Sequence, residues 1–231
     1  MIHYPRIIAH RCGGVLAPEN SLAGLGVAAQ LGCKAVEFDA MLTADRVPIL
    51  MHDETLERTT RCTGRVAEMT FAQIRACDVA VPTLEEAIAD CHRLGLWANI
   101  ELKPAMGHEE ETGTVVGRWL ADHWNGQGVI SSFSEKSALA GRRELPDVPF
   151  AMLCKALPDD WLSRCQRLGA GAVHLAGHSV MPAQATAMND ACIPWATYTV
   201  NVRAEADRLF ALGASAIFTD RPDLWIIFPK G

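Results

Sequence analysis

Short apolar runs alternate along the chain with longer stretches in which apolar residues recur every three or four positions. The short runs are typical of strands buried on both faces, and the longer stretches are typical of amphipathic helices. The expected strands lie near residues 7–9, 36–39, 96–102, 128–132, 149–153, 171–175, 194–200 and 215–219. A helix is expected after each strand, near residues 20–31, 83–94, 111–124, 135–145, 159–168, 182–190, 204–212 and 222–227. Eight such units predict one parallel (β/α)8 TIM barrel, with residues 1–231 as a single domain.

One part of the chain departs from this alternation. After the second strand, a turn at 43–46 leads into an extended piece at 47–51 and then into a polar stretch with few periodic apolar positions. A short helix is expected at 70–76. We interpret residues 54–81 as a small insertion after strand 2 that does not fold as a separate domain.

Ionisable residues occur where the expected strands end, whereas the strand interiors are apolar. His10 and Arg11 follow the first strand, Glu37 and Asp39 lie on the second, and Glu101 with Lys103 closes the third. His52 follows the extended piece. Because the carboxyl ends of barrel strands meet at one rim, these side chains are expected to converge there.

The residue types at this rim point to phosphate chemistry. Glu37 and Asp39 are two positions apart and share a strand face, and with Glu101 they offer the oxygen ligands that Mg2+ or Ca2+ prefers. Arg11 and Lys103 suit an anionic substrate. His10 and His52 suit proton transfer in both directions. Together they predict phosphoryl transfer or phosphodiester cleavage.

Each residue also has a purely structural interpretation. His10 could bond a backbone carbonyl, His52 and Asp53 could form a loop pair or a helix cap, and Glu101 with Lys103 could be a simple ion pair. Weaker candidates for substrate contact are His174, His178, Tyr198 and Phe133.

Composition narrows the class of partner. The net charge is −6 and no run of Lys or Arg occurs, which argues against nucleic acid or an anionic membrane as the main partner. No apolar run approaches about 18 residues, so no membrane span is expected. The N-terminus has no long apolar core, so no signal peptide is expected. Eight scattered cysteines without a metal-binding spacing favour reduced thiols in a cytoplasmic protein.

Six segments together resemble the glycerophosphodiester phosphodiesterase family, in particular its bacterial cytosolic type. They are Ala9–Arg11, Pro18–Ser21, Glu37–Asp39, His52–Asp53, Leu56–Thr60 and Asn99–Pro104. The resemblance implies hydrolysis of glycerophosphodiesters to sn-glycerol 3-phosphate and an alcohol. It also implies roles for seven residues: Glu37, Asp39 and Glu101 bind one divalent cation, His10 and His52 are the acid/base pair, and Arg11 and Lys103 hold the phosphate.

One position departs from the family pattern, and several questions stay open. The family commonly has glycine after His-Arg, where this chain has Cys12, a strained choice if the backbone needs a positive φ. A phospholipase D-like barrel acting on lysophospholipids, a non-catalytic phosphodiester-binding barrel and, more distantly, a barrel aldolase are the alternatives. The sequence does not choose the alcohol, Mg2+ over Ca2+, a cyclic phosphate over water attack, or a monomer over a homodimer.

Overall fold

The computed structural model describes residues 2–225. Eight parallel strands close into a barrel, with neighbours in the order β1-β2-β4-β5-β6-β7-β8-β9 and back to β1. The strands are β1 (Ile7–Ala9), β2 (Ala35–Leu42), β4 (Trp97–Leu102), β5 (Gly128–Ser132), β6 (Phe150–Cys154), β7 (Ala172–Ala176), β8 (Trp195–Tyr198) and β9 (Ala216–Thr219). This confirms the TIM barrel expected from the alternation of strands and helices.

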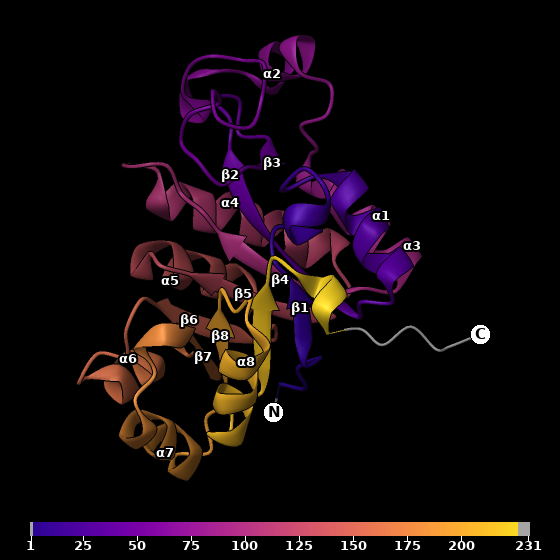
Figure 1. The fold of residues 1–231 in the computed structure, drawn as a ribbon. Coiled ribbons are helices and arrows are strands. Elements are labelled where there is room, and N and C mark those ends of the chain that lie inside the picture. Colours follow the sequence, from indigo (N-terminus) through magenta and orange to yellow (C-terminus); the bar gives the residue numbers. More distant parts are fainter. Residues whose placement is uncertain (1, 226–231) are drawn as a thin grey trace.

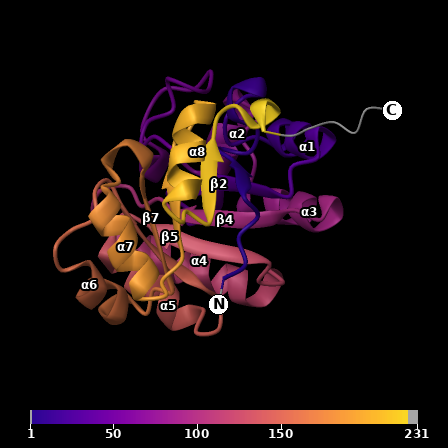
Figure 2. The same cartoon turned by 60° about the horizontal axis from the view of Figure 1, so that its bottom comes forward.

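Helices lie outside the strands and connect them (Figures 1 and 2). They are α1 (Leu22–Leu31), α3 (Leu84–Leu94), α4 (Glu109–His123), α5 (Glu135–Glu144), α6 (Trp161–Leu168), α7 (Pro182–Asp190) and α8 (Arg203–Ala211), with short 3-10 turns η1 (Gly14–Leu16), η3 (Gly177–Ser179) and η4 (Pro222–Leu224). The expected closing helix at 222–227 is a 3-10 turn as far as Leu224, and its end lies outside the described residues. None of the helices within residues 2–225 is long and apolar enough to cross a membrane.

The local sequence explains where several of these helices begin and end. Ser21 caps α1 by accepting a hydrogen bond from the Gly24 amide at 3.0 Å. Thr83 and Glu86 form the expected capping box at the start of α3. Gly32 ends α1 in the left-handed conformation that glycine adopts at low cost.

The segment expected as an insertion stands beyond the carboxyl end of β2 (Figure 1). The strand β3 (Pro48–Leu50), which pairs antiparallel with β2, precedes it, and the segment itself contains η2 (Val66–Glu68) and α2 (Phe71–Cys77). Together with β3 it forms an apolar cluster separate from the main core, which includes Ile49, Leu56 and Ile74. Since Met41 of β2 belongs to the same cluster, the segment is anchored directly on a barrel strand.

The expectation that all cysteines are reduced is wrong for one pair. Cys62 and Cys77 form a disulfide with Cα atoms 5.7 Å apart. The packing of α2 on the separate cluster brings these two positions together, and 15 residues separate them in the sequence. The other six cysteines are free. A spacing of this kind carries no motif that sequence reasoning could have recognised.

Candidate active site

Three buried carboxylates meet at the carboxyl end of two neighbouring strands. Glu37 and Asp39 project from β2, and Glu101 projects from β4 in register with Asp39. One oxygen of each carboxylate lies within 4.8 Å of the other two. Burial and the charge of Asp39 raise the pKa of Glu37 to about 7 and that of Glu101 to about 8. Three acids held this closely in a buried place fit a divalent cation with oxygen ligands.

Two cationic side chains border the carboxylates. The Lys103 amine is 2.9 Å from Glu101 and 3.5 Å from Asp39. Burial lowers the pKa of Lys103, but the charges of Glu101 and Asp39 outweigh it and the pKa is raised. The Arg11 Nε is buried, 3.9 Å from Asp39, and has no hydrogen-bond partner among residues 2–225. A donor left in this state next to the acids suits an oxygen of a bound phosphate.

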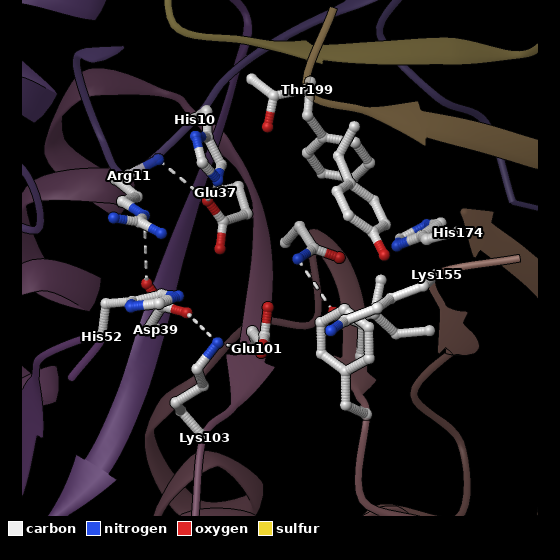
Figure 3. Close-up of a pocket in the computed structure, with 16 residues that line it drawn as sticks. His10, Arg11, Glu37, Asp39, His52, Glu101, Lys103, Lys155, His174 and Thr199 are labelled. Carbon is white, nitrogen blue, oxygen red and sulfur yellow. Dashed lines mark hydrogen bonds and ion pairs between the residues drawn. The ribbon is translucent and has the colours of Figure 1, made fainter. Parts of the chain in front are cut away.

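The two histidines lie next to this cluster, His10 near Glu37 and His52 near Asp39 (Figure 3). Each is held by a carboxylate. His10 follows β1, and its Nδ1 is 2.7 Å from Asp220. His52 follows β3, and its Nδ1 is 2.7 Å from Asp53. Each Nδ1 is therefore engaged, which leaves the Nε2 of each ring for the cavity. The antiparallel β2–β3 pairing brings His52 to the rim, although β3 is not a strand of the barrel.

The environments of the two rings differ. Burial lowers the pKa of His10, but the hydrogen bond to Asp220 and the charge of Glu37 outweigh it, so the pKa is raised. Burial also lowers the pKa of His52, and there the nearby charge of Asp39 does not reverse the effect.

Asn20, which lies just before α1, supports the acid cluster. Its amide nitrogen donates to Asp39 Oδ2 at 2.9 Å, and its amide oxygen accepts from the Asp39 backbone N–H at 3.1 Å. Asn20 has φ 53°, a left-handed conformation that asparagine tolerates better than most residues. The next residue, Ser21, caps α1, whereas Asn20 is the partner of Asp39.

Glu19 and Arg58 form a further support that the sequence did not predict. Glu19 accepts from Arg11 at 3.1 Å and from the Arg58 guanidinium at 2.7 and 2.8 Å. Arg58 also pairs with Asp53, the partner of His52. A continuous chain of hydrogen bonds therefore runs from His52 to Arg11. Both residues lie in segments that resemble the family, but their pairing across 39 positions has no sequence signal.

These groups face one cavity of about 430 Å³. All seven residues expected at the rim line it: His10, Arg11, Glu37, Asp39, His52, Glu101 and Lys103. The cavity also has a mostly apolar wall, formed by Phe133, Leu153, Lys155, His174, Tyr198 and Phe218. Lys155 and His174 of this wall lie across the cavity from the carboxylates (Figure 3). The charged residues expected at the rim and this mostly apolar wall therefore face the same pocket.

The weaker candidates divide between the cavity and other places. His174 lines the cavity floor but is fully buried, with its Nε2 2.7 Å from the Tyr4 hydroxyl. Tyr198 and Phe133 both line the wall, whereas His178 is exposed on η3 outside this cavity. Lys155 was missed, although its place directly after β6 follows the same strand-end rule that identified the others.

Comparison with known proteins agrees with this architecture. Residues 10–224 match the sequence model of the glycerophosphoryl diester phosphodiesterase family. The chain belongs to this family. The assignment confirms the expected resemblance and the enzyme class, a glycerophosphodiester phosphodiesterase.

Individual relatives of the family extend the comparison. A putative glycerophosphodiester phosphodiesterase of Bacillus subtilis is 29% identical over 95% of this chain and 96% of its own length. Glycerophosphodiester phosphodiesterase 1 of Bos taurus is 43% identical, over 41% of this chain and 33% of its own. An Oleispira antarctica phosphodiesterase, solved with the product sn-glycerol 3-phosphate, superposes with a TM-score of 0.92 at 31% identity, covering 95% of this chain and 94% of that one.

Cys12 is where this chain departs from the glycerophosphodiester phosphodiesterase pattern. Its φ is 75°, so the position does require the left-handed conformation that glycine adopts without strain. The side chain is fully buried in the core, and burial raises the pKa of the thiol well above its ordinary value. A buried thiol with a raised pKa is not expected to react readily with thiol reagents.

Proposed function

We propose that the chain hydrolyses glycerophosphodiesters to sn-glycerol 3-phosphate and an alcohol, in a reaction that depends on one divalent cation, Mg2+ or Ca2+. The observation that carries this proposal is the convergence of Glu37, Asp39 and Glu101 within 4.8 Å in a cavity bordered by two cations and two histidines. The product complex of the Oleispira antarctica phosphodiesterase supports the choice of substrate.

The residues divide the work as their positions suggest. When bound by the three carboxylates, the cation supplies positive charge for the phosphate oxygens. Arg11 and Lys103 orient the phosphate and stabilise the charge that develops on it in the transition state. One of His10 and His52 takes the proton of the attacking hydroxyl or water, and the other protonates the leaving alcohol oxygen. Both a cyclic phosphate and direct water attack are compatible with this division.

The first test is metal removal. Purified protein is treated with EDTA, and release of glycerol 3-phosphate is measured before and after Mg2+ or Ca2+ is restored. We expect EDTA to abolish release and one cation to restore it. Glu37→Gln should abolish the restored activity, while Glu85→Gln, an exposed acid on α3, should not change it. Full activity of the EDTA-treated protein, or of the Glu37 variant, would contradict the cation's role.

The same assay separates the alternative substrates. One alternative is a phospholipase D-like barrel that acts on lysophospholipids. Lysophosphatidylcholine is therefore included beside the glycerophosphodiesters. Turnover of the lysophospholipid alone would overturn the proposed substrate, and binding without any turnover would indicate a non-catalytic barrel. A cytoplasmic location and a monomeric or homodimeric state stay predictions.

A further inference from the structure

Lys155 is the cation of the cavity that the phosphate site does not use. It directly follows β6 and extends from the apolar wall, with its amine directed toward the middle of the cavity (Figure 3). The Lys103 amine is paired with Glu101 and Asp39. Within residues 2–225, the Lys155 amine forms neither a side-chain hydrogen bond nor an ion pair. A cation without a partner inside a binding cavity is available to a ligand.

The groups around Lys155 are neutral. Phe133, Leu153 and Phe218 are apolar, and the Tyr198 hydroxyl donates to the Cys154 carbonyl at 2.7 Å. Burial lowers the pKa of His174 to about 3, so this ring carries no charge near neutral pH. Within the described residues, Lys155 is therefore the only charged side chain of this wall.

No carboxylate in the described cavity lining is free to offset that charge. The acids among the lining residues are Glu37, Asp39 and Glu101, the three proposed to hold the cation. Lys155 is exposed to the cavity mouth, and an alcohol group with a positive charge would meet its ammonium there without an acid to pair with. Hydroxyls and anionic oxygens, in contrast, accept the hydrogen bonds that an ammonium donates.

The aromatic side chains of the same wall, taken alone, would favour the opposite selectivity, for a cationic alcohol group. Phe133, Tyr198 and Phe218 are the ring types that bind quaternary ammonium groups through cation–π contacts. Phe133 already has the Lys103 amine 5.7 Å from its ring centroid. A second cation among these rings would add repulsion from Lys103 as well as from Lys155, so the charges favour an uncharged or anionic group here.

We infer that Lys155 determines which alcohol the enzyme accepts. Diesters with a polyhydroxylated or anionic alcohol, such as glycerol or inositol, are preferred over diesters of the cationic alcohols choline and ethanolamine. This inference rests on the proposed function, because it assigns the apolar wall to the alcohol half of the same substrate.

The test compares kcat/KM for three diesters in the presence of the activating cation. Glycerophosphoinositol and glycerophosphoglycerol should be hydrolysed roughly 10-fold more efficiently than glycerophosphocholine, the scale of one favourable or unfavourable charge in a pocket. Lys155→Met should remove the preference, and Lys155→Glu should reverse it. Lys34→Glu makes the same charge change before β2, at the opposite end of the barrel, and should leave the preference unchanged.

Three results would overturn the inference. An equal loss on all three diesters in Lys155→Glu would place Lys155 on the shared glycerol phosphate half. A wild-type preference for glycerophosphocholine would show that the aromatic rings select the alcohol. Failure of the wild-type protein to hydrolyse any diester would overturn the proposed function, and the inference with it, and is distinguished from the other two by the absence of all product.

Discussion

The two histidines share a construction that is visible only at the level of single atoms. Each ring is anchored through Nδ1 to a carboxylate at 2.7 Å, one to Asp220 and the other to Asp53. Such a contact fixes the ring orientation and the tautomer, so that Nε2 is presented to the substrate in a defined state. The pairing makes both rings suitable for proton transfer and gives separate predictions for rings and anchors.

Replacing either ring should remove most of the activity. His10→Ala and His52→Ala are each expected to lower kcat by roughly 100-fold or more, which is the usual contribution of a positioned acid or base. His92→Ala, an exposed position on α3, is the matched control and should have no effect. The measurement is kcat and KM for release of glycerol 3-phosphate. A variant that raises only KM would assign that histidine to substrate binding.

The carboxylate behind His10 should matter less than the ring but more than an ordinary surface acid. Asp220→Asn weakens the hydrogen bond to His10 Nδ1 and can turn the amide nitrogen instead of an oxygen toward it. We therefore expect kcat to fall by roughly 10-fold or more with little change in KM. Asp223→Asn, which removes a surface ion pair with Arg221 a few residues away, is the control. If Asp220→Asn and the control behave alike, Asp220 has no positioning role.

At the scale of elements, the segment between β3 and α3 does more than extend the barrel. It contributes Arg58, whose guanidinium bonds both Glu19 of the β1–α1 connection and Asp53 beside His52. Two loops that are distant in sequence are therefore joined above the carboxylate cluster. Because Glu19 also bonds Arg11, the position of a side chain proposed to bind the phosphate depends on a residue from outside the barrel.

Removing this link should loosen both ends of the chain of hydrogen bonds. Arg58→Gln is expected to lower kcat/KM by roughly 10-fold, because His52 loses part of its support and Glu19 is left to bind Arg11 alone. Arg61→Gln, in the same segment, is the control, since its backbone rather than its side chain contacts Asp78. Thermal unfolding of each variant is measured in parallel. Loss of activity that only follows a loss of folded protein would contradict a positioning role.

At the scale of the whole molecule, the barrel could be predicted from the sequence because apolar runs and helical stretches alternate regularly along most of the chain. Eight apolar runs with helices between them leave few arrangements other than a closed parallel sheet. The strand-end rule also located the rim residues that the structure brings together, including Glu37 and Glu101 from neighbouring strands. Both inferences depend on properties that each segment carries by itself.

What could not be predicted depends on contacts between distant segments. His10 and Asp220 are 210 positions apart, and only closure of the barrel through the β1–β9 pairing makes them neighbours. The same holds for Glu19 with Arg58 and for the disulfide of the added segment. Lys155 lay at a strand end but had no partner nearby in sequence to draw attention to it. Apart from Lys155, the strand-end residues were therefore predictable, whereas their supports were not.

The stability of the whole barrel should depend on pH through His174. This ring is buried inside the barrel, and its Nδ1 has no partner in the described part of the chain. Burial lowers its pKa to about 3 from an ordinary value of 6.5. Between these values the unfolded chain binds a proton that the folded chain does not, so stability is complete above about pH 6.5 and falls as the pH decreases. His174 alone should lower the free energy of unfolding by about 1.4 kcal/mol between pH 7.5 and 5.5.

The measurement is urea unfolding of wild type and variants at both pH values. His174→Gln should lose this pH difference in stability, while the exposed His178→Gln should retain it. Equal pH dependence in wild type and His174→Gln would mean that the ring is protonated in the folded barrel.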